Sequence, residues 1–354
     1  MNKEKVIVGM SGGVDSSVCA YLLKEEGYDV IGVTMDFWHD DEPEDIYRNL
    51  EDAADAKAVC EVLGIPHIAM NFTKGFRKNV EEYFRSEYVK GRTPNPCIRC
   101  NETVKWGALL EKAEELGVEY IATGHYARID RMENGRLSVK NSVTAKKDQT
   151  YVLYRLSQEQ LWHTLMPIGE YEKDEIRKIA EQMKLPVAAK KDSQDICFID
   201  DGDYAGYLKN YENGSAFSEG DFVLLDGTVV GRHKGLAHYT VGQRKGLGIA
   251  LGKHVFVHHL DVKGNRVVLC DNEDLFTDTL YAGNIRCMAE ERFDENKTYM
   301  GKIRYSHTAE PCRVSYEAED RIKVVFENKV RAVTPGQSVV LYTGDYVAGG
   351  GEIE

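Results

Sequence analysis

The sequence predicts an α/β protein in which an N-terminal parallel sheet is followed by two small β-rich domains. Apolar runs alternate with helical patterns through the first half of the chain, which is typical of a parallel sheet covered on both faces. A glycine turn joins the first apolar run to the first helical pattern. After about residue 208 the predicted strands become short and alternating, and turn signals such as Asp226-Gly227 and Gly344-Asp345 separate them.

Length and composition are consistent with several domains. The chain has 354 residues, of which 42% are hydrophobic, and we expect domains at 1–207, 208–274 and 275–354. It contains no run of about 18 apolar residues, and its first residues lack the apolar region of a secretory signal. We therefore expect a cytoplasmic protein with no membrane partner. Eight cysteines in such a chain predict free thiols, metal or redox chemistry rather than a disulfide scaffold.

The spacing of apolar residues predicts each element of the N-terminal region. Continuous apolar runs predict parallel strands at residues 6–10, 30–35, 65–70 and 119–123. Helical spacing predicts a first helix from Val14 to a glycine cap at Gly27, and later helices near residues 46–62, 74–90 and 172–183. The apolar stripe of the second helix is expected at four-residue steps, namely Ile46, Leu50, Ala54, Ala58 and Val62.

Residues 92–101 interrupt this pattern. Pro94 and Pro96 are separated by one residue, and proline lacks the N–H group that a helix interior needs. We therefore predict an ordered loop over these residues and a new helix that begins near Thr103.

The turn after the first strand predicts an anion site. Glycines at residues 12 and 13 let the backbone approach a ligand closely, and serine hydroxyls at 11, 16 and 17 add hydrogen-bond donors. The free N–H groups of the helix start and the positive end of its dipole lie at the same place. The alternative is a glycine turn that only starts a helix.

Asp15 is the unusual residue of this turn. A carboxylate beside phosphates is repulsive unless a divalent cation lies between them, so we predict bound Mg²⁺ with Asp15 as its ligand. The turn lacks the Gly-x-x-x-x-Gly-Lys-Ser/Thr pattern of kinases and GTPases. Ligands of parallel sheets bind beyond the carboxyl ends of the strands, where Ser11, Met35 and Gly124 are expected. We expect ATP in that crevice, with Met35 against the adenine.

Three cysteines stand out from the other five. Cys97 and Cys100 form a single C-x-x-C pair, which by itself is a weak zinc signal. Cys197 lies in a polar stretch, where nearby lysines are expected to lower the pKa of its thiol and favour the reactive thiolate. The remaining cysteines are expected to be small buried hydrophobic residues.

A basic stretch begins in the predicted central domain. No acidic residue occurs between Asp226 and Asp261, although the whole chain has a net charge of −13, and Arg244 and Lys245 lie in this stretch. Nucleic-acid binding depends on local patches rather than on net charge, so these two residues are candidate phosphate contacts. The alternative is a solvated loop face.

Seven motifs in order give the sequence a close family resemblance. They are residues 11–16, 93–101, 122–126, 147–151, 192–199, 242–248 and 334–338. This set resembles the bacterial tRNA-specific 2-thiouridylases, which are PP-loop ATP pyrophosphatases, over essentially the whole chain. The resemblance implies ATP-dependent replacement of O2 of the wobble uridine by sulfur in tRNAs for Lys, Glu and Gln. It also implies a cysteine desulfurase or a sulfur-relay protein as the sulfur donor.

The resemblance implies roles for individual residues. Cys197 resembles the cysteine that carries persulfide sulfur, and Cys100 resembles its partner thiol, which would leave a Cys100–Cys197 disulfide. The implied ATP-binding residues are Gly9, Met10, Ser11, Gly12, Gly13, Val14, Asp15, Ser16, Met35 and Gly124. The implied tRNA-binding residues are Asn95, Pro96, Cys97, His125, Lys147, Asp148, Gln149, Arg304, Tyr305 and Gln337.

Cys97 is the one departure from the family pattern, because many members have aspartate at this position, proposed as a general acid or base. Either a thiolate takes that role here, or Cys97, Cys100 and Cys197 together hold an iron–sulfur cluster. Two other functions compete with thiolation. One is a synthetase of the same ATP class that uses ammonia, against which three site cysteines and the lack of a glutaminase region argue. The other is a non-catalytic nucleotide-binding sensor.

Overall fold

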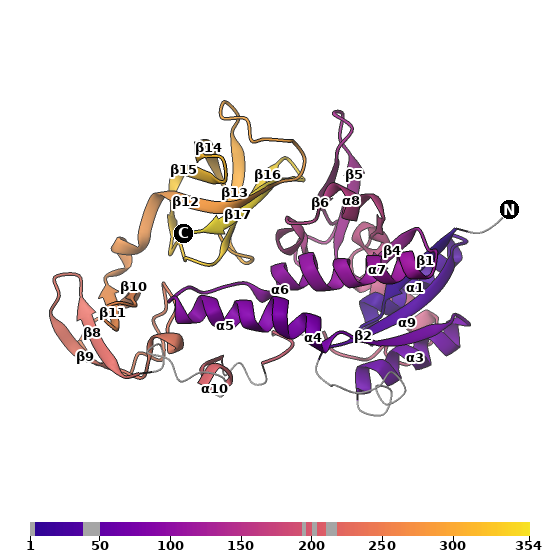
Figure 1. Cartoon of the computed structure of the whole chain (residues 1–354), viewed down its shortest axis with the longest axis horizontal. Helices are drawn as coiled ribbons and strands as arrows, with labels where there is room; N and C mark the ends of the chain where they lie inside the picture. The colour runs from indigo at the N-terminus through magenta and orange to yellow at the C-terminus, as the bar shows by residue number, and fades with distance from the viewer. Residues whose placement is uncertain (1–3, 38–49, 193–195, 200–203, 210–217) are drawn as a thin grey trace.

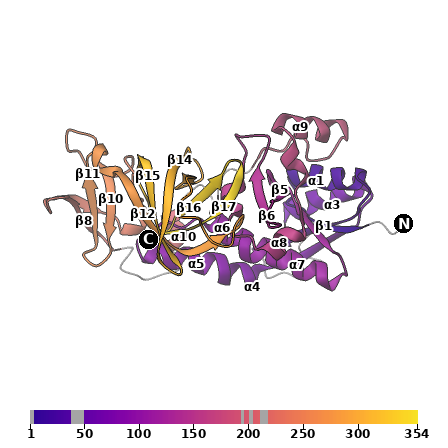
Figure 2. The same cartoon turned by 90° about the horizontal axis from the view of Figure 1, so that it is seen from above.

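The computed structural model describes residues 4–37, 50–192, 196–199, 204–209 and 218–354. The molecule is elongated, and two views agree on its layout (Figures 1 and 2). The parallel sheet lies at one end, a four-stranded sheet at the other, and a β-barrel beside the helices between them.

The predicted parallel sheet is confirmed. Its order is β3 (His67–Asn71), β2 (Asp29–Asp36), β1 (Lys5–Gly9), β4 (Tyr120–Thr123) and β7 (Thr164–Leu165), and each neighbouring pair is parallel. Helix α1 (Val14–Glu25) follows β1 directly. Because β1 is the central strand, the glycine turn after it lies between the ends of β2 and β4.

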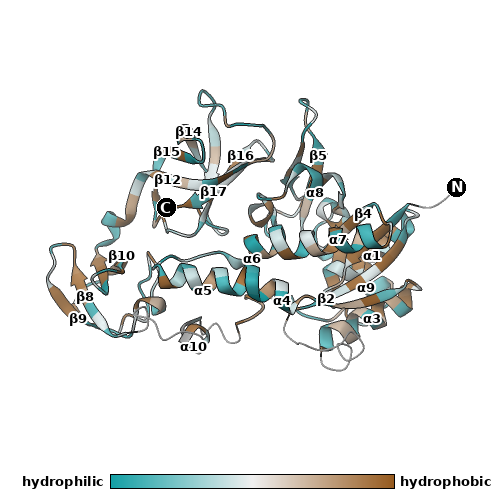
Figure 3. Cartoon of the chain, viewed as in Figure 1, coloured by the Kyte–Doolittle hydropathy of each residue, from teal (hydrophilic) through white to brown (hydrophobic). Residues whose placement is uncertain are grey.

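Helices cover both faces of this sheet. On one face, Val6 and Val8 of β1 pack with α1, α3 (Glu51–Leu63) and α9 (Lys173–Gln182). On the other face, Ile7 packs with Trp106 and Leu109 of α7 (Trp106–Glu115). The alternation along β1 follows from the two-residue period of a strand, and Figure 3 shows hydrophobic residues on the strands of this sheet.

Helix α3 exposes the stripe that the sequence predicts to be buried. Val62 is 54% exposed, and Ala54 is exposed as well. The buried residues are Ala53, Ala56, Val59, Cys60 and Leu63. The two stripes have the same helical period, and alanine is common enough in both that apolar spacing alone selects the wrong one. Ile46 lies outside the described residues.

The predicted loop around the two prolines is wrong in part. Helix α6 (Pro96–Arg99) begins at Pro96, and Asn95 caps it by accepting a hydrogen bond from the backbone N–H of Cys97. Proline is tolerated at the first helical position because the N–H of that position has no partner within the helix. A π-helical stretch, η2 (Cys100–Lys105), then continues into α7, so Cys97 and Cys100 lie on a helix.

The segment before these prolines is helical as predicted. It consists of α4 (Thr73–Phe76), the π-helical η1 (Arg77–Glu81) and α5 (Glu82–Val89). Shorter helical elements occur later, namely η3 (Thr150–Leu153), α8 (Gln158–Trp162), η4 (Pro167–Glu170), α10 (Tyr204–Lys209), η7 (Leu236–His238) and η8 (Asn272–Leu275). No helix within the described ranges is long and apolar enough to cross a membrane.

The C-terminal half is β-rich, as predicted. The four-stranded sheet has the strand order β10 (Phe256–Asp261), β11 (Arg266–Cys270), β8 (Gly220–Leu224) and β9 (Val229–His233). The larger sheet runs β12 (Phe276–Cys287), β15 (Arg321–Arg331), β14 (Glu310–Ala318), β13 (Tyr299–Lys302), β16 (Ser338–Thr343) and β17 (Tyr346–Ile353). Pairing of β12 with β17 closes these strands into a barrel.

The barrel shares its packing with the N-terminal region. The hairpin β5 (Ala127–Arg131) and β6 (Leu137–Asn141) extends the larger sheet through a β6–β17 pair. Tyr154 is fully buried and its hydroxyl bonds the Ser338 hydroxyl at 3.1 Å. At Gly350 a Cβ atom would contact the Val339 carbonyl oxygen and lie 2.9 Å from the Tyr154 ring. The position of the barrel therefore depends on a strand residue without a side chain.

We predict that Gly350→Ala lowers the free energy of unfolding by about 1–3 kcal/mol, because the new methyl group overpacks the contact with Tyr154. The control is Gly107→Ala in α7, where a Cβ has nothing within 4 Å and alanine stabilises a helix by up to about 1 kcal/mol. Urea unfolding measures both variants. Equal stability of Gly350→Ala and the parent would contradict this account of the contact.

Candidate active site

A cavity of about 520 Å³ lies at the carboxyl ends of β1, β2 and β4. This volume is in the range that small-molecule ligands occupy. Nine of the ten predicted ATP-binding residues line it, namely Gly9, Met10, Ser11, Gly13, Val14, Asp15, Ser16, Met35 and Gly124. Gly12 does not line it; its φ is +66°, and a Cβ there would contact the Asp52 backbone at the start of α3.

The glycine turn presents free backbone donors. Gly13 is the N-cap residue of α1 and no side chain caps this helix start. The Ser11 N–H donates to the Ser16 hydroxyl at 3.2 Å, and the Ser17 hydroxyl donates to the Gly13 carbonyl at 2.7 Å. These bonds hold the turn in shape and leave the first N–H groups of the helix for a ligand, as in other anion sites at helix starts.

Gly124 is required by close approach of two backbones. A Cβ at Gly124 would lie 2.6 Å from the backbone nitrogen of Ser16, closer than real Cβ atoms come. Any other residue would push the end of β4 away from the first turn of α1. The glycine therefore keeps the cavity closed at its base, beside the predicted nucleotide.

Asp15 has two partners on one of its oxygens. The Tyr126 hydroxyl and Lys173 Nζ each lie 2.7 Å from Asp15 Oδ1. Within the described part of the chain, Oδ2 has no hydrogen-bond partner. One carboxylate oxygen beside phosphates is enough for Mg²⁺, which is usually held by one or two carboxylates, phosphates and water. The residues present therefore fit a divalent cation that arrives with a nucleotide.

Several cavity residues were missed by sequence reasoning. Thr34 donates its hydroxyl to the Met10 carbonyl at 2.9 Å and also bonds His67, whose pKa burial lowers to about 4. Lys190 forms ion pairs with Asp52 and Asp55 of α3, at 2.7 and 2.6 Å. The other missed lining residues are Phe37, Leu50, Lys105, Thr123, Lys191 and Asp192. Phe37 follows β2 directly, Thr123 lies within the motif 122–126, and Asp192 begins the motif 192–199, directly after Lys191. Leu50 and Lys105 have no such signal in the sequence.

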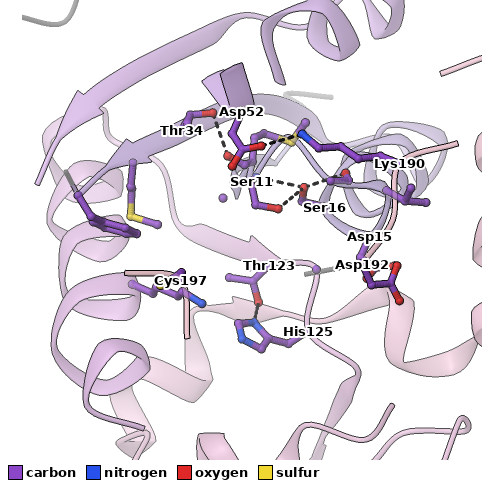
Figure 4. A pocket seen from close by; sticks show the side chains of 18 of the residues that line it. Ser11, Asp15, Ser16, Thr34, Asp52, Thr123, His125, Lys190, Asp192 and Cys197 are labelled. Atoms are coloured by element: carbon purple, nitrogen blue, oxygen red, sulfur yellow. Dashed lines mark hydrogen bonds and ion pairs between the residues drawn. The ribbon is translucent and has the colours of Figure 1, made fainter. Parts of the chain in front are cut away.

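Cys197 lines the same cavity as the glycine turn. Figure 4 shows Asp15 and Asp192 on one side of the cavity and Cys197 on the other, with Thr123 and His125 between them. Cys100 is buried in a cluster with Phe198, the residue after Cys197. Cys97 is exposed. All eight cysteines are free thiols.

The predicted lowering of the Cys197 pKa is wrong. Although the residue is partly exposed, neighbouring protein atoms desolvate its thiol, and this desolvation raises the pKa of Cys197 to about 11. Burial raises the pKa of Cys100 to about 12. The Lys105 ammonium lowers the pKa of both thiols, but by less than desolvation raises it. At neutral pH both thiols are therefore mostly protonated.

Comparison with known proteins agrees with this arrangement. Family profiles described as tRNA methyl transferase HUP domain, tRNA methyl transferase PRC-barrel domain and Aminomethyltransferase beta-barrel domain match residues 4–201, 206–271 and 277–353. Proteins named tRNA-specific 2-thiouridylase MnmA are similar over the whole length. Those of Lachnoclostridium phytofermentans and Clostridioides difficile are 52% and 51% identical, covering 99% and 100% of this chain and 99% of each relative. That of Clostridium acetobutylicum is 50% identical over 100% of both chains.

This chain belongs to the tRNA-specific 2-thiouridylase family. The residues predicted to contact tRNA, from the family resemblance and from the basic stretch, fall into three groups in the structure. His125 is buried beside Trp106, with Nδ1 2.8 Å from the Thr123 hydroxyl, and desolvation lowers its pKa well below the usual value. Gln149 lines the cavity too and accepts a hydrogen bond from the Tyr126 N–H at 2.8 Å.

A second group joins the cavity region to the barrel. The Tyr305 hydroxyl donates to the Asp148 carbonyl at 2.9 Å, and Gln337 donates to the Thr93 carbonyl at 2.7 Å. Arg304 donates to the Arg331 carbonyl at 3.0 Å. Lys147 forms an ion pair with Asp192. Asn95 caps the helix that carries Cys97, and Pro96 is the first residue of that helix. These two predicted tRNA-contacting residues therefore also have a structural role.

Arg244 and Lys245 form the third group. Both side chains are exposed and lie between β9 and β10 in the sequence. These two strands belong to the sheet at the end of the molecule opposite the parallel sheet (Figure 1). Of the residues that the structure describes, no three His, Cys, Asp or Glu side chains are grouped so that they could hold a metal ion. Cys97, Cys100 and Cys197 therefore do not form a ready-made metal site in the described structure, and the iron–sulfur interpretation stays a prediction.

We predict that alkylation of Cys197 by iodoacetamide rises about tenfold per pH unit from pH 7 to 9, because thiolate grows at that rate below the thiol pKa. Lys105→Met slows the reaction at every pH, since removal of the ammonium raises the pKa further. Lys74→Met, at an exposed position in α4, is the control. A Cys197 rate that levels off near pH 8 would contradict the raised pKa.

Proposed function

We propose that this chain is an ATP-dependent tRNA-uridine 2-sulfurtransferase that acts on the wobble uridine of tRNAs for Lys, Glu and Gln. One observation carries the proposal: the glycine turn and the Cys197 thiol line a single cavity. An activating nucleotide and a sulfur carrier can thus reach the same base. We assign the chemistry to residues 1–207, which also hold seven of the twelve proposed tRNA-contacting residues, and the other five contacts to residues 208–274 and 275–354.

Activation of the base uses the glycine turn. A uracil carbonyl oxygen is a poor leaving group, and transfer of AMP to O2 with release of pyrophosphate makes it a good one. In the proposed site the N–H groups of the turn and the serine hydroxyls hold the phosphates, while Met35 lies against the adenine. Mg²⁺, held by Asp15 and the phosphates, would neutralise phosphate charge.

Sulfur transfer uses Cys197 and Cys100. A cysteine desulfurase or a relay protein loads Cys197 as a persulfide, whose terminal sulfur attacks C2 of the base; the C2–O2 bond breaks and AMP leaves. The Cys100 thiolate then attacks Sγ of Cys197 and breaks the persulfide S–S bond. The transferred sulfur stays on the base, and the Cys100–Cys197 disulfide is later reduced by a thiol. Phe198, the residue after Cys197, packs against the hydrophobic cluster that contains Cys100, which supports this pairing.

Cys97 lines the entrance for the base in this scheme and carries no sulfur. The target uridine must leave the anticodon stack, because its C2 is not accessible within it. An exposed side chain at the start of α6 is suited to contact such a base. In the cluster alternative Cys97 is instead an essential ligand, but we derive no step through a cluster because the three thiols do not form a metal-binding group.

We predict that Cys97→Ser, loaded with persulfide at Cys197, still forms 2-thiouridine in a single turnover, at a rate within about tenfold of the parent. Cys100→Ser is the matched comparison, since it removes the attacking thiol and leaves sulfur bound through Cys197. Liquid chromatography and mass spectrometry of digested tRNA measure the product, and anaerobic purification gives the iron content. About four irons per chain together with an inactive Cys97→Ser would contradict the persulfide scheme.

Contacts with tRNA are expected far from the cavity as well as in it. Arg244 and Lys245 have no partner for their side-chain cations in the described structure, and the stretch around them has no acidic residue. Phosphate contacts of this kind release counterions and depend on salt. They would position the anticodon arm, while unstacked bases are read near the cavity.

We predict that Arg244→Ala with Lys245→Ala weakens tRNA binding and flattens its logarithmic salt dependence by about one unit of slope per lost contact. Filter binding across a range of salt concentrations measures the slope. Lys178→Met on α9, an exposed lysine outside the proposed contacts, should leave it unchanged. Equal slopes for the double variant and the parent would exclude these contacts.

A further inference from the structure

Three basic side chains meet where the β-barrel contacts the four-stranded sheet. Arg331 is the last residue of β15, and Arg304 lies in the turn after β13. Arg304 Nη1 donates to the Arg331 carbonyl oxygen at 3.0 Å. His307 belongs to the same turn, because its N–H donates to the Arg304 carbonyl oxygen at 3.0 Å. The turn after β13 is therefore held against the end of β15.

No carboxylate neutralises the two arginines in the described structure. Neither forms an ion pair with a described residue. Arg331 Nε donates to the neutral Asn272 side chain at 3.1 Å, and its guanidinium lies 5.0 Å from the centre of the Phe256 ring. Desolvation and the charge of Arg331 lower the pKa of Arg304 below its usual value. Two cations held this close without a counter-ion repel each other, so an anion would bind favourably between them.

The surroundings of His307 show the same excess of positive charge. Its Nδ1 is buried and has no hydrogen-bond partner among the described residues. Burial and the Arg304 cation lower its pKa, Glu310 opposes this effect, and Lys302 adds to it. The Glu310 carboxylate is itself engaged by the Asn328 amide at 3.2 Å. The nearby carboxylate therefore does not balance the cations of this turn.

Arg331 also contacts the basic stretch of the central domain. A Cβ atom at Gly242 would lie 3.5 Å from Arg331 Nη1, so the chain at residue 242 lies against the end of β15. Arg244 and Lys245 follow two and three residues later, and both are exposed. On its other side Arg331 contacts Arg304. Arg331 thus lies between the basic stretch and the turn after β13.

We propose that Arg331 and Arg304 together bind one phosphate group of an RNA backbone. The proposal rests on the proposed function for the identity of the RNA as tRNA, and it adds a contact, at Arg331, that no sequence motif indicates. Arginine suits this role because its planar fork can give two donors to one phosphate.

The surroundings of the site favour an RNA strand over a free anion. The site continues the stretch of Arg244 and Lys245, for which phosphate contacts are proposed above. Tyr305 follows Arg304 directly and is 44% exposed. Cations in succession beside an exposed aromatic ring match a strand that repeats phosphates and bases. A single free anion would use only the two arginines.

The test is the salt dependence of tRNA binding by the full-length protein, measured with an unmodified transcript of a tRNA for Glu. In Arg331→Met we expect weaker binding and a logarithmic salt slope that is smaller by about 0.7–0.9 units, the contribution of one phosphate contact. Arg331→Lys keeps a cation at the site and should retain most of the slope. Arg313→Met, at an exposed position of β14 in the same barrel, removes the same charge and should keep the parent's slope.

Two further measurements separate the contact from a structural role and from a free anion. Asn272→Ala removes the hydrogen bond of Arg331 but leaves its charge, so the parent's slope should remain. Inorganic phosphate, titrated calorimetrically into the protein without RNA, should not saturate a site below about 1 mM. If Arg331→Met does not fold, Arg304→Met tests the same phosphate and must give the same loss of slope.

An unchanged slope in a folded Arg331→Met variant would overturn the proposal, as would an equal loss of slope in Arg313→Met or Asn272→Ala. Saturable binding of inorganic phosphate that Arg331→Met abolishes would assign the site to a free anion and would also overturn it. Failure of the parent to thiolate tRNA, with the difference in slope intact, would instead count against the proposed function.

Discussion

The close approach of Gly124 to the first turn of α1 is the constraint on which the site depends. It requires a residue without a side chain at the end of β4, and it places Tyr126 where its hydroxyl reaches Asp15. Tyr126 and Lys173 then hold the same carboxylate oxygen, and Lys173 holds Asp192. The end of β4 is thus linked to Asp192 through the side chains of Tyr126, Asp15 and Lys173.

Desolvation and the positive charge of Lys105 have opposite effects on the pKa values of the Cys100 and Cys197 thiols. Desolvation raises the pKa of Cys197 to about 11, and Lys105 offsets only part of that rise. A thiol kept protonated at neutral pH attacks an activated base slowly. Burial also raises the pKa of Cys100, so in the proposed scheme this thiol must lose its proton before it attacks Sγ of Cys197.

Much of the fold follows from sequence patterns, and each incorrect prediction has a physical cause. Apolar runs predict the strands and their parallel arrangement around β1. The glycine turn predicts the cavity at their carboxyl ends. The buried face of α3 was misassigned because alanines occupy both candidate stripes. The helix at Pro96 was missed because proline blocks a helix interior but not its first position.

The missed site residues have a different cause. Lys105 lies five residues after Cys100, a spacing that turns about 140° in an α-helix and so predicts different faces. The π-helical stretch bonds residues five apart, which brings Lys105 closer to the side of the thiols. Lys173 and Asp192 meet only in three dimensions, 19 residues apart in sequence and on elements whose packing no local pattern describes.

The central claim is that one cavity performs two separable steps, and the most direct measurement follows both in one experiment. Pyrophosphate release and 2-thiouridine formation are measured in a first turnover with tRNA, ATP and Mg²⁺. We predict that Cys197→Ser releases pyrophosphate at nearly the parent's rate but forms no 2-thiouridine, whereas Asp15→Ala does neither. Pyrophosphate release that is unchanged in Asp15→Ala, or thiolation by Cys197→Ser, would contradict the account.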